Sequence, residues 1–443
     1  MNETLRPVTN RRVLAIAGPI VLSNATVPIL GAVDAGVVGQ IPDPVPLAAV
    51  GIGAVILSAI YWIFGFLRMG TVGLASQALG SGERAEADAV LSRALLIAGA
   101  GGFLLIALQF PIFAAAFAVS PASAEVEAAA RSYMQIRIWS APFAIAVYGM
   151  TGWLVAAERT RGILVLQLWM NGINIALDLL FVLGFGWGVE GVAIATLIAE
   201  VAGAGMGLWL CRDAFARPHW RDRARVFSRA PLLRMASVNA DILIRSLLLQ
   251  TIFVSFLFFG AGFGDVTLAA NHVLLLFLEI VAFALDGFAF AAETLVGQAM
   301  GARARAELRR GAVLTSAWGL VVCAALALIF ALGGEALIAL MSKSPEVQAT
   351  ARAFLPWMVA APFVGLGAYM LDGIFIGATR TADMRNMMIV SAAIYFAAVW
   401  TLMPAFDNHG LWAALILSFV ARTVTLGLRY PALERSADSQ SAA

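Results

Sequence analysis

The sequence predicts an all-α polytopic membrane protein with twelve transmembrane helices, arranged as two pseudo-symmetric six-helix bundles. Three observations support this fold class. Of the 443 residues, 61% are hydrophobic and only 13% are charged, whereas soluble domains are about 45–50% apolar. The apolar residues form runs long enough to cross a bilayer. Two parts of the chain also repeat each other, which indicates an internal duplication.

Twelve apolar segments are candidate membrane spans, since each can supply the roughly 20 residues that a helix needs to cross the hydrocarbon core. A polar, arginine-rich linker over 212–231 divides them six and six. We therefore expect an N-terminal lobe over 1–211 and a C-terminal lobe with a short polar tail over 232–443. The segments are 13–39, 46–79, 88–117, 127–157, 162–184, 188–211, 232–260, 267–299, 308–340, 347–377, 385–404 and 409–430.

The basic residues between the spans predict the orientation. If both termini lie in the cytoplasm, the cytoplasmic segments hold 22 arginines, and the opposite side holds only Arg131, Lys343 and Arg352. Positive residues concentrate on the cytoplasmic side of membrane proteins. We therefore expect a multi-pass protein of a bacterial-type cytoplasmic (inner) membrane, with both termini and the linker in the cytoplasm.

The repeat relates the two predicted lobes. The stretch "GLASQALGSGERAEA" (73–87) matches "TLVGQAMGARARAEL" (294–308) at an offset of 221 residues. At the same offset, "GWLVAAERT" (152–160) matches "GIFIGATRT" (373–381). Because each lobe has an even number of spans, both enter the membrane from the same side. Parallel repeats of this kind are typical of one group of secondary transporters.

Asp34 is a carboxylate inside the first apolar span. A charged side chain there costs about 2.5–3.5 kcal/mol on insertion scales, so it normally faces a partner or a water-filled cavity. The fifth span offers a row of polar side chains, Gln167, Asn171, Asn174 and Asp178. Their spacing of four, three and four residues places them on one helical face.

The acids in these two spans also match in depth. Asp34 lies six residues before Gln40 and Asp178 six before Gly184, in spans that both run outward. At 1.5 Å per residue, both lie roughly 9 Å below the outer end. Thr196 lies eight residues into the sixth span, again in the outer half. The candidate cation-binding and coupling residues are therefore Asp34, Asn174, Asp178 and Thr196, supported by the polar stripe of Gln167 and Asn171.

The chemistry of this cluster leaves the coupling ion open. Two neighbouring acids in a low dielectric suit H⁺, whereas a set of hard oxygen ligands suits Na⁺. The alternative is a structural hydrogen-bond cluster worth about 0.6 kcal/mol per contact, although such a cluster would not need two acids. We expect no cofactor and no metal site beyond a Na⁺ site, because the two cysteines and three histidines lack metal-ligand spacing.

Pro19 lies inside the first span, where it removes one backbone donor. The carbonyl that loses its partner predicts a kinked helix. The kink is either static or a point at which the span bends and straightens, and the sequence leaves both alternatives open.

Four motifs together resemble one transporter family. They are "VDAGVVG" in the first span, "FLRMGTVGLASQALG" in the second, "NGINIALDLLFVLGFGWGVEGVAIAT" in the fifth and sixth, and "LDGIFIGATRT" in the tenth. They are similar to motifs of the multidrug and toxic compound extrusion (MATE) transporters, specifically the subfamily of DNA-damage-inducible protein F. The resemblance covers nearly the whole chain.

The resemblance implies a fold of two six-helix bundles around a central V-shaped cleft. It also implies antiport of organic, often cationic or aromatic, compounds against H⁺ or Na⁺. Members of this subfamily hold the cation in the first lobe, on residues that map onto Asp34, Asn174, Asp178 and Thr196. The first-span proline that bends in family members maps onto Pro19.

The second half also carries acids inside apolar segments. Asp286 and Glu293 lie two helical turns apart on one face of the eighth span, and with Glu279 they could line the C-lobe side of a cleft and attract cations. A packed polar network is the alternative. Asp372, near the inner end of the tenth span, is a further candidate for the cleft, although it could simply lie at the membrane interface.

Asp241 and Arg245 are four residues apart, so we expect an ion pair on one helix face. Arg245 is nearly the only arginine deep in a predicted span. This disfavours the second hypothesis, a lipid-linked oligosaccharide flippase of the same wider superfamily, which would need arginines for phosphate. A membrane-embedded enzyme, the third hypothesis, is disfavoured because the chain has no H-E-x-x-H motif, no G-x-S-x-G motif and no Ser/His pair at motif spacing. The expected partners are small organic molecules and the lipid bilayer, with no nucleic acid and no second subunit.

Overall fold

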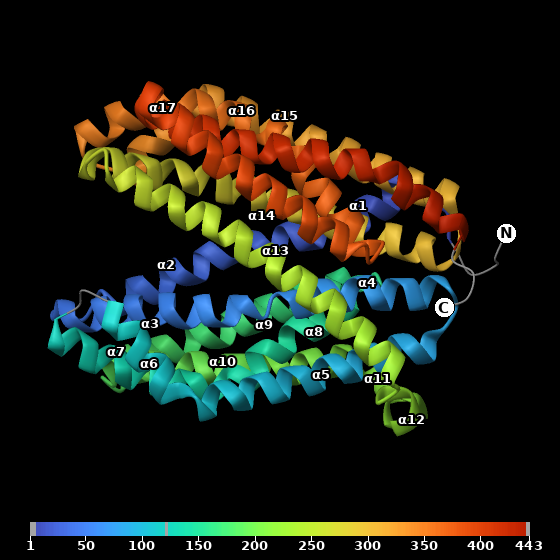
Figure 1. Ribbon diagram of the computed structural model, residues 1–443. Coiled ribbons are helices and arrows are strands. Elements are labelled where there is room, and N and C mark those ends of the chain that lie inside the picture. The colour runs from blue at the N-terminus through green and yellow to red at the C-terminus, as the bar shows by residue number, and fades with distance from the viewer. Residues whose placement is uncertain (1–5, 120–122, 440–443) are drawn as a thin grey trace. The chain divides into compact units, whose positions relative to one another are not determined.

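The computed structural model describes residues 6–119 and 123–439, which contain helices and no strand (Figure 1). The first six predicted spans correspond to α1 (Asn10–Ala25) and α2 (Val27–Val38); α3 (Pro44–Ile63) and α4 (Phe66–Gly80); α5 (Arg84–Ala107) and α6 (Gln109–Val119); α7 (Ala124–Arg137), η1 (Ile138–Ser140) and α8 (Ala141–Ala156); α9 (Thr160–Asp178) and η2 (Leu179–Gly184); and α10 (Gly188–Leu210).

The linker and the second half continue the helical chain. The linker contains α11 (Arg212–Phe215), η3 (Pro218–Arg221) and α12 (Arg223–Val226). The second half consists of α13 (Arg229–Ala261), α14 (Asp265–Gly301), α15 (Arg305–Met341), α16 (Pro345–Gly377) and α17 (Thr381–Ser439).

Ten helical stretches among the described residues are long and apolar enough to cross a membrane. The difference from the twelve predicted spans has two causes. The first span is divided into α1 and α2, of 16 and 12 residues, so neither piece reaches full span length. The last two spans form one run, Thr381–Asp438, which continues across a kink at Asp407. The predicted all-α polytopic membrane fold is confirmed.

The backbone repeats the duplication seen in the sequence. Left-handed φ values occur at Gly82 and Arg303, at Glu158 and Thr379, and at Gly186 and Asp407, each pair separated by 221 residues. The same offset relates two helix caps, where the side chains of Ser123 and Ser344 accept hydrogen bonds from the backbone N–H groups of α7 and α16. Since non-glycine residues rarely adopt positive φ, this coincidence shows that the two halves preserve the same turns.

The helices form two compact units that do not coincide with the halves of the sequence. One unit consists of Met1–Val21, Val72–Glu83 and Met235–Ala443, and the other of Leu22–Thr71 and Arg84–Arg234. The residues of α1 up to Val21 and the end of α4 therefore pack with the second half. The lobe boundaries predicted at 211 and 232 follow the duplication and stay a prediction.

Repeated glycines allow α4 to pack closely on α14. A Cβ atom on Gly80 would lie 2.0 Å from the carbonyl oxygen of Gln298, and one on Gly301 would lie 2.0 Å from that of Gln77. These four residues form the pairs that the repeat aligns, Gln77 with Gln298 and Gly80 with Gly301. Small residues at such positions let membrane helices approach each other closely. The duplicated motif thus meets its own copy within one compact unit.

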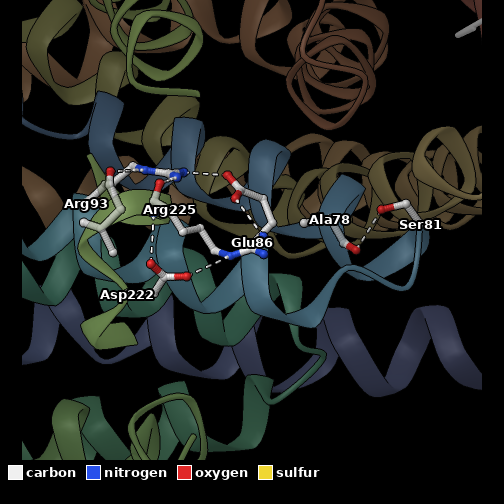
Figure 2. A network of polar contacts seen from close by, with 7 residues as sticks. Ala78, Ser81, Glu86, Arg93, Asp222 and Arg225 are labelled. Atoms are coloured by element: carbon white, nitrogen blue, oxygen red, sulfur yellow. Dashed lines mark hydrogen bonds and ion pairs between the residues drawn. The ribbon is translucent and has the colours of Figure 1, made fainter. Parts of the chain in front are cut away.

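The linker is held against α5 by a buried arginine. Figure 2 shows Arg93, whose side chain is 1% exposed, reaching Glu86 and the backbone of the linker. Its guanidinium donates hydrogen bonds to Glu86 Oε1 (2.6 Å), to the carbonyl oxygen of Arg225 (2.7 Å) and to that of Val226 (2.8 Å). The linker is therefore an ordered part of its unit.

Candidate functional site

The first span is interrupted just before the segment that carries Asp34. Thr26 separates α1 from α2, and both its backbone N–H and its hydroxyl bond to the carbonyl oxygen of Ser23. Pro28, the second residue of α2, has no N–H and suits a helix start. Pro19 lies inside α1, seven residues before the interruption. Its predicted role in bending stays a prediction.

Asp34 and Asp178 meet at the centre of the candidate site. Their carboxyl groups lie within hydrogen-bonding reach of each other. Asn174 Nδ2 donates to Asp178 Oδ2 at 2.8 Å, and both fifth-span residues are at most 1% exposed. The Oδ1 atoms of Asp34 and Asp178 are buried and have no hydrogen-bond partner among the described residues. The site thus offers two carboxyl oxygens that can bind a cation or a proton.

The polar stripe of α9 continues from this acid pair to the helix interruption. Gln167 Nε2 donates to Asn171 Oδ1 (2.9 Å), and Asn171 Nδ2 donates to Thr26 Oγ1 (3.1 Å). The half-buried Thr196 behaves differently, because its hydroxyl donates to the carbonyl oxygen of Val192 in its own helix (2.9 Å). The structure therefore joins Asn171 to the break in the first span and brings Asp34, Asn174 and Asp178 together, with Thr196 bonded to α10.

A buried ion pair beside these acids was not recognised in the sequence. Arg137, the last residue of α7, donates to Glu200 Oε1 of α10 at 2.7 Å and to the Tyr133 hydroxyl at 2.9 Å. Its charge acts on both Asp34 and Asp178. One signal could have revealed the pair: Arg137 and Glu200 lie 14 and 12 residues from Ser123 and Gly188, the ends of their spans, and so match in depth.

The predicted pair of Asp241 and Arg245 on one face of α13 is wrong. Asp241 instead bonds Arg385 and accepts a hydrogen bond of 3.0 Å from the Thr381 hydroxyl, both on α17. Arg245 forms an ion pair with Asp372 of α16. Partners on neighbouring helices present their charged ends more directly than a residue one turn away on the same helix. Asp241 and Arg245 therefore belong to two separate interhelical contacts.

Asp372 lies between two buried arginines. In addition to its pair with Arg245, its Oδ2 lies 3.8 Å from an Nη2 of Arg422 on α17. The Arg422 guanidinium also lies over the rings of Tyr369 and Phe419, at 5.9 and 5.7 Å from their centroids. The expectation that Arg245 is nearly the only deep arginine is thus wrong, because Arg422 and Arg137 are buried as well.

The other second-half acids take different positions. Glu293 is 2% exposed and Asp286 is half-buried, and both act electrostatically on Arg245. Glu279 is exposed. The suggestion that Asp286, Glu293 and Asp372 line a cleft stays a prediction, although Asp372 is committed to arginine within its own unit.

Sequence comparison relates this chain to known transporters. Residues 19–180 and 242–401 match the MatE protein family. The chain is 38% identical to DNA damage-inducible protein F of Escherichia coli over 415 residues, covering 93% of this chain and 90% of that protein. It is 24% identical to the probable multidrug resistance protein NorM of Xanthomonas campestris, covering 94% and 92%.

Solved structures share the fold. The Vibrio cholerae MATE transporter VcmN in its bent form superposes with a TM-score of 0.86 at 19% identity, covering 97% of this chain and 98% of that one. A MOP superfamily transporter from Pyrococcus furiosus, described as having a binding pocket of reverse polarity, gives a TM-score of 0.84 at 17% identity, covering 96% of both chains.

Proposed function

Since this chain belongs to the MatE family of multidrug and toxic compound extrusion transporters, we propose that it exports organic, often cationic or aromatic, compounds in exchange for protons. The observation that carries this proposal is that the carboxyl groups of the half-buried Asp34 and the fully buried Asp178 lie within hydrogen-bonding reach of each other. A hydrogen bond between two carboxyl groups requires that one of them holds a proton. The pair can therefore take up and release one proton as its surroundings change.

Two carboxyl oxygens of the cluster have no hydrogen-bond partner. One oxygen of Asp34 and one of Asp178 are buried without a partner among the described residues. Leaving a buried polar atom without a partner costs about 1–3 kcal/mol. A proton or a cation bound at these oxygens would offset this cost, which supports exchange at this site.

Protons fit these residues better than sodium. A sodium ion would require several oxygen ligands at once. The hydrogen bonds that Thr196 donates to the carbonyl oxygen of Val192 (2.9 Å) and that the Asn174 amide donates to Asp178 leave the oxygens of both side chains able to bind a cation. Two neighbouring acids in a low dielectric disfavour double ionisation, which favours H⁺ as the coupling ion. Na⁺ is the alternative that the experiment below must distinguish.

The division of the first span suggests how the site changes during transport. Residues up to Val21 belong to one compact unit and residues from Leu22 onward to the other. The interruption at Thr26, with Pro19 one to two turns before it, can absorb a change in direction between the two parts. Asn171 bonds Thr26 and lies on the same helix as Asp178. Bending of the first span at Thr26 would therefore change the position of α9 and of Asp178 relative to Asp34.

The flippase hypothesis is less well supported. A flippase site would need arginines that are available to a phosphate group. Of the four buried arginines that the described residues contain outside the linker contact, three, Arg137, Arg245 and Arg422, each face an acid. From the distribution of basic residues between the spans, we place the protein in a bacterial inner membrane with both termini in the cytoplasm. We propose that it acts as a monomer.

The experiment is efflux from proteoliposomes loaded with ethidium, a cationic aromatic dye. In sodium-free buffer, an imposed pH gradient should drive dye movement, and a protonophore should abolish it. Dye movement that fails under the pH gradient and starts on adding a Na⁺ gradient would overturn proton coupling. Dye that moves under neither gradient, while a lipid-linked oligosaccharide is translocated, would favour the flippase.

A further inference from the structure

Arg137 is fixed in place by contacts from four elements. Its guanidinium donates to Glu200 of α10 and Tyr133 of α7, at 2.7 and 2.9 Å. Its own carbonyl oxygen accepts hydrogen bonds from the hydroxyls of Tyr61 on α3 (3.1 Å) and Ser140 of η1 (2.6 Å). The residue is 9% exposed, in the middle of an apolar span. Such a residue cannot be an interfacial anchor, since both its side chain and its backbone are committed to the interior.

The charges around the acid pair are few and their positions are known. Asp34 comes from α2, Asp178 from α9, Arg137 from α7 and Glu200 from α10. The neutral titratable groups that face this ion pair are the hydroxyls of Tyr61, Tyr133 and Tyr148. Arg137 is thus the cation that the described residues place beside Asp34 and Asp178. Its Nε and Glu200 Oε2 are buried without hydrogen-bond partners, so the ion pair does not use all of its polar atoms.

The charge of Arg137 lowers the free energy needed to release a proton from the acid pair. When the proton leaves, the acid pair gains a negative charge in a low-dielectric interior, which is unfavourable unless a positive charge lies nearby. Arg137 supplies that charge, and Glu200 moderates it by holding the guanidinium in an ion pair. Without Arg137 the acids would hold the proton too tightly to release it. Without Glu200 the full charge of Arg137 would act on the acids, and they would release the proton too early.

We propose that the Arg137–Glu200 ion pair is the positioning element that sets the proton affinity of the Asp34–Asp178 pair. This inference rests on the proposed proton coupling and adds residues to it. It predicts the direction in which the pH of protonation changes in each variant, which a purely structural ion pair would not predict. Removing Arg137 and removing Glu200 should move the pH of protonation in opposite directions, whereas the loss of a structural ion pair would impair both variants in the same way.

The test is infrared titration of the purified full-length protein, following the carbonyl absorption of protonated carboxyl groups as a function of pH. In Arg137→Gln, the midpoint assigned to the acid pair should rise by roughly one pH unit or more, and in Glu200→Gln it should fall by a similar amount. Arg137→Lys keeps the charge and should remain close to wild type. Equal midpoints in Arg137→Gln, Glu200→Gln and wild type would overturn the inference, as would shifts of both in one direction.

Two controls separate the possible failures. The double variant Arg137→Gln/Glu200→Gln leaves no lone buried charge, so it provides a folded protein, verified by thermal unfolding, if a single variant fails to fold. Its midpoint should lie between those expected for the two single variants, and a midpoint outside that interval would contradict the proposal. The variant Asp34→Asn/Asp178→Asn should remove the titrating band, because it contains neither acid of the pair. If the band persists in that variant, the proposed proton site itself is wrong. If the band disappears there but does not respond to Arg137 or Glu200, only the inference about the ion pair fails.

Discussion

The two halves of the molecule share their turns but not their buried charges. In the first half, Asp34 faces a second acid, Asp178, and the neighbouring Arg137 is already bonded to Glu200. That cluster contains three acids and one arginine among its described charged residues. Because acids outnumber bases, a proton or another cation is needed to balance the site.

The second half places arginine against two of its buried acids, Asp372 and Asp241. Asp372 lies between Arg245 and Arg422, and Asp241 bonds Arg385. The negative charge of a carboxylate between two guanidinium groups is balanced within the protein. The duplication therefore preserved the backbone while the charges diverged, which supports our proposal that the first half exchanges the cation and the second half uses ion pairs for packing.

The largest loss of transport activity is expected when one acid of the first-half pair is removed. Asp34→Asn should reduce proton-driven dye export at least about 100-fold, because an amide cannot take up and release the proton. Asp178→Asn should do the same, and the double variant should be no worse than either single one, because the acids act as one unit. Wild-type efflux from Asp34→Asn at matched protein levels would contradict this assignment.

The matching change in the second half should affect folding. Asp372→Asn leaves Arg245 and Arg422 buried without their shared counter-charge, and breaking a buried ion pair costs about 3–5 kcal/mol. Thermal unfolding of the purified protein should show the loss. Asp372→Asn combined with Arg245→Gln removes one of the two charges and should recover part of it. Normal stability of Asp372→Asn together with loss of coupling would make the two halves equivalent and the comparison wrong.

The repeated glycines should behave alike in both halves. Gly80→Ala and Gly301→Ala each place a methyl group 2.0 Å from a carbonyl oxygen of the facing repeat, so α4 and α14 must move apart. Overpacking of this kind costs about 1–3 kcal/mol, which thermal unfolding can measure. Gly99→Ala is the control, since a Cβ atom there meets nothing within 4 Å. A clear loss of stability in only one of the two glycine variants would show that Gly80 and Gly301 do not contribute equally to the contact between α4 and α14.

The smallest change in stability is expected on removing an ion pair that lies outside the spans. Arg159 bonds Asp213, and this contact holds the pKa of the Asp213 carboxyl below its usual 3.8. A lowered pKa contributes stability above the unfolded value, and that contribution is lost as the pH falls through the folded pKa. Because both side chains are over 40% exposed, Asp213→Asn should cost only about 0.2–1 kcal/mol at neutral pH and nothing in strong acid. An equal cost at both pH values would rule out the ion pair as its source.

Features repeated along the chain could be predicted from the sequence, whereas contacts between helices could not. Hydropathy and the 221-residue offset predict the helices and their duplication, and the spacing of Asn174 and Asp178 with the depth of Asp34 predicts the three residues that meet. The prediction for Asp241 failed because spacing reports only partners on the same helix, while its partners lie 140 and 144 residues away.

Local backbone departures were not predicted from the sequence either. The chain directly after Asp178 forms a π-helix, η2, and the first span breaks at Thr26 rather than at a proline. The π-helix has no cause in the composition of its segment, whereas Pro28, which lacks an N–H and begins α2, favours the break at Thr26. The Arg137–Glu200 contact joins two helices across 63 residues, and the similar depth of the two residues in their spans is the sequence signal that points to it.

Proton release on substrate binding tests the central claim most directly. Purified protein in weakly buffered, sodium-free detergent solution is mixed with ethidium, and a pH-sensitive dye follows the protons released. The account predicts about one proton released per bound ethidium by the wild type and by Asp241→Asn, whose acid is paired in the second half. It predicts none from Asp34→Asn or Asp178→Asn. Undiminished release from Asp34→Asn, or its loss in Asp241→Asn alone, would contradict the assignment of coupling to the first-half acid pair.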